Sequence, residues 1–148
     1  MSTHQAAYDA LAALVTADTG ATGLNNSASL SHLFGGFTRV GDPERARLLP
    51  FIEFEVAGER EQDAMNTNRA DLVVRLHLFT DRNVMYRTTL PGNQNTIVTR
   101  MRAVFHGATP SASGGWNFNK IYRTSAVQAP STEVEGHWVE TYLMRLSA

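Results

Sequence analysis

Five histidines are the side chains in this sequence best suited to bind a metal. They are His4, His32, His77, His106 and His137. None of them has the H-x-H or H-x-x-x-H spacing that is typical of a metal site on one strand or one helix. The sequence therefore predicts no metal site. We interpret each histidine as a surface side chain or as one whose hydrogen bonds are satisfied inside the fold.

Two pairs of carboxylates are the candidates for acid–base chemistry. Glu53 pairs with Glu55, and Glu133 pairs with Glu135. Residues two apart on a strand share one face, and such a pair can act as general acid and base when partly buried. More often it is the solvated side of an amphipathic strand. The G-x-S-x-G elbow and the glycine-rich phosphate loops are absent. We therefore expect no catalytic residue, no cofactor and no enzyme activity.

The composition excludes several classes of protein. The 148 residues carry 13 basic and 14 acidic side chains and no cysteine. A nucleic-acid-binding domain normally has a basic excess, and a chain without cysteine has no disulfides or iron–sulfur clusters. No apolar run approaches the roughly 18 residues of a membrane span, and the first residues lack the pattern of a signal peptide. We expect a single domain over 1–148, with no membrane contact, in a cytoplasm or in a particle assembled there.

The basic residues are almost all arginine. Lys120 is the one lysine beside 12 arginines. A GC-rich genome explains this bias. An arginine-rich contact surface also explains it, because the guanidinium group suits protein interfaces better than the lysine ammonium does.

Hydrophobic periodicity predicts the elements that position these side chains. Apolar residues recur at helical spacing over 3–18 and 94–106, and Ser2 with Gln5 has the spacing of a capping box. Apolar and polar residues alternate in several other segments. The predicted strands are 37–40, 48–56, 70–80, 116–127 and 133–146. This order predicts an α+β fold, with a mainly antiparallel sheet of about four to five strands and two helices packed on one face.

The predicted strands at 70–80 and 133–146 are apolar on both sides. Val73 and Phe79 lie on the same side of the strand over 70–80 as Arg75 and His77, opposite a stripe of leucines and valine. An antiparallel sheet with one solvated face should instead alternate cleanly. One interpretation is a curved sheet that folds over itself. The other is a face covered by partner subunits, because apolar patches with arginine mark contact surfaces.

Two polar segments lie between the predicted elements. They span 58–69 and 81–93, and both are longer than a tight hairpin requires. They are either mobile loops or segments that become ordered when a neighbour docks.

The sequence resembles the tail terminator proteins of long-tailed bacteriophages over nearly its whole length. The resemblance lies in the order of the elements and in a few residue types. These are an Ala/Leu-rich helix over 6–15, the proline-led strand LLPFIEF at 48–54, the long strand at 70–80, the phrase VFHG at 104–107, and the last strand WVETYLMRL at 138–146. Residues 19–47 are longer and richer in Gly, Asn and Ser than this family leads us to expect.

This resemblance implies a structural virion protein. Its copies would form a homo-oligomeric ring, a hexamer, at the head-proximal end of the tail, assembled in the host cytoplasm. The ring would stop polymerisation of the tail tube protein and dock to a neck or head–tail connector protein. DNA would pass through its channel without specific binding, and the near-neutral net charge suits that role. Subunit interfaces in such a ring are heterologous.

Four residues are the candidate subunit or partner contacts under this interpretation. They are Arg75, His77, Arg123 and Arg145. Two alternatives remain open. One is another phage neck, head-completion or baseplate assembly protein. The other is a small-molecule-binding α+β enzyme, with Glu53, Glu55, Arg75 and His77 around a concave sheet face.

Overall fold

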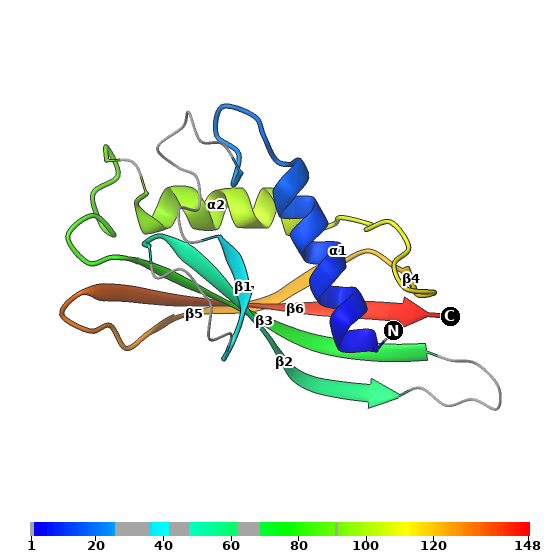
Figure 1. The fold of residues 1–148 in the computed structure, drawn as a ribbon. Coiled ribbons are helices and arrows are strands. Elements are labelled where there is room, and N and C mark those ends of the chain that lie inside the picture. The colour runs from blue at the N-terminus through cyan, green and yellow to red at the C-terminus, as the bar shows by residue number, and fades with distance from the viewer. Residues whose placement is uncertain (1, 26–35, 42–47, 62–68, 91) are drawn as a thin grey trace.

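The computed structural model describes residues 2–25, 36–41, 48–61, 69–90 and 92–148. Two helices lie on one side of a twisted sheet (Figure 1). The helices are α1 (Thr3–Ala17) and α2 (Gln94–Phe105). The strands are β1 (Phe37–Arg39), β2 (Phe51–Glu61), β3 (Arg69–Asp81), β4 (Asn117–Phe118), β5 (Tyr122–Ala129) and β6 (Glu135–Ser147). The predicted α+β class is confirmed.

The sheet is mixed, with antiparallel pairing through most of its width. Its order is β1-β2-β3-β6-β4, and β5 also pairs with β6. Strands β2, β3, β6 and β5 run antiparallel to one another in that order, whereas β1 is parallel to β2. The prediction of about four to five strands is too low, because the described residues contain six.

The extra strand arises where one long strand was predicted over 116–127. The Asn119 N–H still donates to the Arg145 carbonyl of β6 at 3.0 Å, but Ile121 leaves this ladder and pairs elsewhere. The Gly107 N–H donates to the Ile121 carbonyl at 2.7 Å, and the Ile121 N–H donates to the Ala108 carbonyl at 2.8 Å. These bonds hold the chain against the end of α2 and divide the segment into β4 and β5.

Strand β2 is longer than its apolar pattern predicts. It continues through Glu61, past a bulge between Val56 and Gly58, into residues that were predicted to form a polar connection. The pairing with β3 explains this, because the β3 backbone supplies hydrogen bonds to these polar residues as well. The remainder of the connection, 62–68, lies outside the described residues.

Both helices begin at capping side chains. The Ser2 hydroxyl accepts a bond from the Gln5 N–H at 3.1 Å, as predicted, and the Asn93 carboxamide accepts one from the Thr96 N–H at 2.9 Å. Gly107 follows α2 with φ of 79°, the left-handed conformation that glycine adopts easily at a helix end.

The hydrophobic core lies between the helices and the sheet. The predicted β3 stripe of Leu72, Val74, Leu76 and Leu78 is fully buried there. From α2 come Ile97, Met101 and Phe105, and from α1 come Ala6, Ala7 and Leu11. Leu24 also joins this core, as expected for an apolar residue of the 19–47 stretch, whereas Leu30, Leu33 and Phe34 lie outside the described residues.

Candidate interaction surface

The side of the sheet away from the helices, here called the open face, carries exposed apolar side chains. The register places Val73 of β3 opposite Leu143 of β6, and Leu143 opposite Tyr122 of β5. Val73 is 39% exposed, Tyr122 is 47% exposed and Val127 is 59% exposed. An apolar strip therefore crosses the open face from β3 to the β5 border without cover from the described residues.

Two of the predicted contact residues flank this strip. Arg75 and Arg145 are each more than half exposed. The Arg145 Nε lies 3.6 Å from the Asp71 carboxylate, and an Arg75 Nη lies 4.0 Å from the Glu55 carboxylate. Exposed ion pairs contribute only about 0–1 kcal/mol, so both guanidinium groups remain available to a partner.

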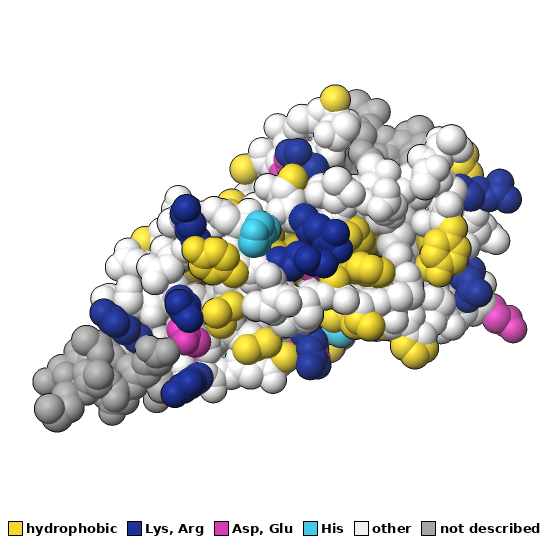
Figure 2. Space-filling model, turned by 180° about the vertical axis from the view of Figure 1, so that it is seen from behind, with side chains coloured by type: hydrophobic (Ala, Val, Ile, Leu, Met, Phe, Trp, Pro, Cys, Tyr) yellow, Lys and Arg dark blue, Asp and Glu magenta, His cyan; other side chains and the backbone are white. Residues whose placement is uncertain are grey.

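The surface seen from behind is rich in basic side chains. Figure 2 shows Lys and Arg side chains spread over this view with apolar side chains between them, and few acidic ones. Alternating guanidinium and apolar groups of this kind are characteristic of protein contact surfaces.

His77, the third predicted contact, lies in a hydrogen-bonded cluster on the open face. Its Nε2 lies 3.0 Å from the Glu55 carboxylate, and its Nδ1 lies 2.9 Å from the His137 Nε2. The ring of His137 stacks on Phe79, with 4.4 Å between centroids. Burial, and secondly the neighbouring His77, lower the pKa of His137, so its neutral form is favoured. This arrangement suits a neutral His137 whose Nε2–H donates to the Nδ1 of His77.

Arg123, the fourth predicted contact, lies on the helix side of β5. Its Nε donates to one oxygen of Glu140 at 2.9 Å, and the Arg102 Nε of α2 donates to the other at 2.8 Å. Glu140 is fully buried, so its charge requires such partners. This cluster was not predicted. The sequence does contain a sign of it, because Glu140 alternates with Trp138 and Tyr142 and so lies on the same, apolar side of β6.

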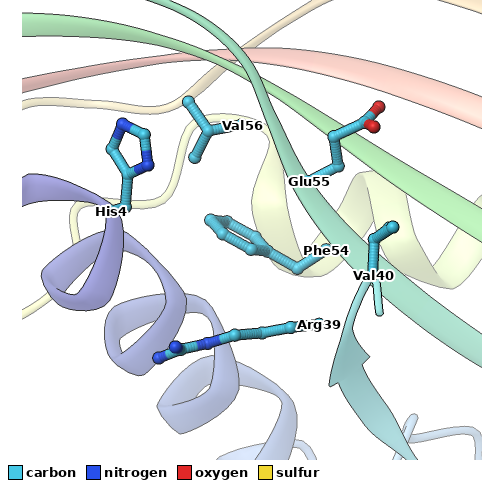
Figure 3. A pocket seen from close by; sticks show the side chains of 6 residues that line it. All are labelled: His4, Arg39, Val40, Phe54, Glu55 and Val56. Carbon is cyan, nitrogen blue, oxygen red and sulfur yellow. The ribbon is translucent and has the colours of Figure 1, made fainter. Parts of the chain in front are cut away.

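A shallow hollow of about 320 Å³ lies where β1 ends beside β2 (Figure 3). Its lining residues are His4, Arg39, Val40, Phe54, Glu55 and Val56. Of the residues expected around an enzyme site, Glu55 lines this hollow. Arg75 and His77 do not, and Glu53 is buried. Arg75 and His77 instead lie within 4.0 Å of the Glu55 carboxylate, so the structure brings three of the four expected residues together, while the hollow is lined by only one of them.

Within the described ranges, no three His, Asp or Glu side chains are grouped so that they could hold a metal ion. Nor does a helix in those ranges have the length and hydrophobicity needed to span a membrane.

Comparison with known proteins gives a match in structure but not in sequence. No known protein family and no curated protein matches the chain. A chain in the solved structure of the virion of a native gene transfer agent (GTA) particle has a similar fold. The TM-score is 0.70 with 14% sequence identity, over 97% of this chain and 96% of that chain. This likeness shows that the two chains share their fold over almost their whole lengths.

Proposed function

We propose that this protein is a structural component of a phage-like virion. More specifically, we propose a tail terminator whose copies form a hexameric ring at the head-proximal end of the tail. The observation that carries the proposal is the apolar strip of Val73, Leu143, Tyr122 and Val127 on the open face. The shared fold with a chain of a virion particle supports it.

The strip favours assembly because the described part of the chain does not bury it. Apolar surface removed from water stabilises a contact by roughly 25 cal/mol per Å², and monomeric proteins seldom leave a long apolar strip uncovered. The exposed Arg75 and Arg145 beside it supply charged groups that set the orientation of a partner.

The proposed partners are other copies of this chain, the tail tube protein below the ring and a neck or connector protein above it. DNA passes through the ring without specific contacts, and the proposal assigns no catalytic step and no cofactor. Another neck, head-completion or baseplate protein would use the same surface. A terminator stops growth of the tail tube, so the effect on tube length distinguishes it from these alternatives.

The experiment measures oligomeric state and tube capping. Light scattering over a range of concentrations, alone and with tail tubes, should reveal species of six 16.3 kDa chains. Added protein should also stop tube growth. Protein that stays monomeric even with tubes present, and leaves their length unchanged, contradicts the proposal. Hexamers that leave tube length unchanged favour another neck or baseplate role.

Charge reversal tests the contact residues. Arg75→Glu and Arg145→Glu should weaken ring formation at least tenfold while the thermal unfolding of the monomer is unchanged. Arg87→Glu, on the exposed segment between β3 and α2, is the matched control. His77 and Arg123 remain proposed contacts. Their internal hydrogen bonds mean that reversing their charge also disturbs the protomer.

A further inference from the structure

Strand β5 forms a border of the sheet whose outer edge is largely unpaired. It pairs with β6 on one side along Tyr122–Ala129. On the other side, among the described residues, the Arg123 N–H has a partner in the His106 Nδ1 at 3.0 Å, and the backbone groups after it have none. Unpaired strand edges are templates for pairing with another chain.

Beyond Arg123 and the bulge that follows it, this edge lacks the features that usually prevent such pairing. Natural edge strands carry lysine, proline or inward charges, or are covered by another element. Residues 124–129 read Thr-Ser-Ala-Val-Gln-Ala, with no charge and no proline. A bulge between Arg123 and Ser125 interrupts the ladder near the start of the strand and leaves the rest regular.

A second open edge lies at the opposite border of the sheet, on β2. Strand β1 covers only the first part of β2, because Phe37–Arg39 pairs with Ile52–Phe54 and the Val40 N–H makes one more bond to Phe54. Beyond that point, 56–61 has no strand on its outer side within the described residues. The hollow at the end of β1 opens beside this segment (Figure 3).

The strand directions allow these two edges to meet. Going across the sheet, β2, β3, β6 and β5 alternate in direction. When a second copy is related by rotation about an axis along the strands, its β2 therefore runs antiparallel to β5 of the first copy. The contact joins two different edges, so it is heterologous and can close into a ring.

The charges at the two borders are complementary. The segment from Glu55 to Glu61 contains three glutamates and one arginine. At the β5 border, the partly exposed Arg102 and Arg123 share a single carboxylate, that of Glu140, and the exposed Lys120 lies nearby, so the border keeps a net positive charge. Opposite charges at the two edges favour β2 beside β5 over β5 beside a second β5.

We propose that β5 of one copy pairs, antiparallel, with residues 56–61 of β2 in a second copy, so that the sheet continues from subunit to subunit. This inference rests on the proposed ring, whose subunit contact it specifies.

Disulfide cross-linking tests the pairing directly, because the chain contains no cysteine. Val127→Cys marks the β5 edge, and Gly58→Cys or Arg60→Cys marks the β2 edge. By register, all three residues lie on the open face. Residues opposite each other in a strand pair lie about 4.5–5.5 Å apart at Cα, which a disulfide can bridge. Thr88→Cys, exposed and outside both edges, is the control.

The expected result is selective cross-linking under mild oxidation. A mixture of Val127→Cys with one of the β2 variants should give covalent dimers. Their yield should be at least tenfold higher than for either variant alone, and at least tenfold higher than for a mixture of Val127→Cys with Thr88→Cys. A double variant with Val127→Cys and that β2 change in one chain should give a ladder up to the hexamer.

Two outcomes overturn the pairing while leaving the proposed function intact. One is a hexamer by light scattering without mixed cross-links from either β2 variant. The other is dimers from Val127→Cys alone, which would indicate two β5 strands side by side. A chain that neither assembles nor caps tubes overturns the proposed function and the pairing together.

Discussion

Arg100 of α2 holds the carboxylate of Asp18, directly after α1, with its Nε 2.8 Å from one carboxylate oxygen. Asp18 is buried, and the same oxygen accepts a bond from the Leu24 N–H at 2.7 Å. One carboxylate therefore joins the two helices and also fixes the turn that follows α1.

Asp18→Asn should make the protein less stable at neutral pH and less sensitive to acid. The hydrogen bond from Arg100 lowers the pKa of Asp18 below its usual 3.8. The ionised form therefore stabilises the fold above about pH 4, and this stability is lost as the pH falls through the lowered pKa. We expect a loss of about 1–3 kcal/mol at pH 7, measured by urea unfolding.

The comparison at pH 3 decides this prediction. The difference in unfolding free energy between wild type and Asp18→Asn should shrink there, whereas Asp9→Asn, on the same helix, should show a small effect at both pH values. A difference that is the same at pH 7 and pH 3 would contradict the assignment.

The losses of unfolding free energy on removing Arg102 and on removing Arg123 should be strongly non-additive. Either arginine alone still pairs with the buried Glu140, so each alanine variant should lose about 1–2 kcal/mol. Without both, the carboxylate is buried and unpaired, which costs about 3–5 kcal/mol or more. Urea unfolding of the wild type, both single variants and the double variant measures the coupling. Losses that add to within about 0.5 kcal/mol would show that the two arginines act independently.

The pH dependence of stability near neutrality should depend on His137. Its pKa is lowered in the folded state by burial, so unfolded chains bind the proton more readily than folded ones. Stability is therefore full above about pH 6.5 and decreases as the pH falls towards the lowered pKa. The melting temperature of His137→Gln should fall less between pH 7 and pH 5 than that of wild type. An equal fall in melting temperature for the two proteins would contradict this role of His137.

Gly23→Ala should open the turn after α1. A Cβ at this position would lie 2.1 Å from the Asp18 carbonyl oxygen, which accepts a bond from the Asn25 N–H. We expect a loss of about 1–3 kcal/mol, or several degrees in melting temperature. Gly20→Ala is the matched control, because nothing lies within 4 Å of its Cβ. Equal melting temperatures for the two variants would refute the crowding argument.

The sequence predicts the parts of this fold that depend on local signals. The Ser2 cap, the buried stripe of β3 and the apolar side of β6 all follow from spacing within one element. Other features depend on contacts between distant segments. The break before β5 arises from bonds between Ile121 and the residues after α2, and no local pattern marks it.

The candidate interaction surface also has features that the sequence predicts and features that it does not. Alternation places Val73 and Arg75 together on one side of β3, and the structure confirms it. Whether Arg123 faces the same side depends on the register of β5 against β6, which includes a bulge. The sequence shows neither the register nor the bulge, so the pairing of Arg123 with Glu140 was not foreseen.

Strand β6 has a consequence for synthesis of the chain. It pairs with β3 along its full length and holds β4 and β5 on its other side, yet it follows all three in the sequence and is made after them. On the ribosome, β3 lacks one neighbour and β4 and β5 lack any until β6 emerges. Chains truncated before β6 should therefore leave one edge of β3 unpaired and leave β4 and β5 without a partner strand, which exposes strand edges to aggregation and proteolysis.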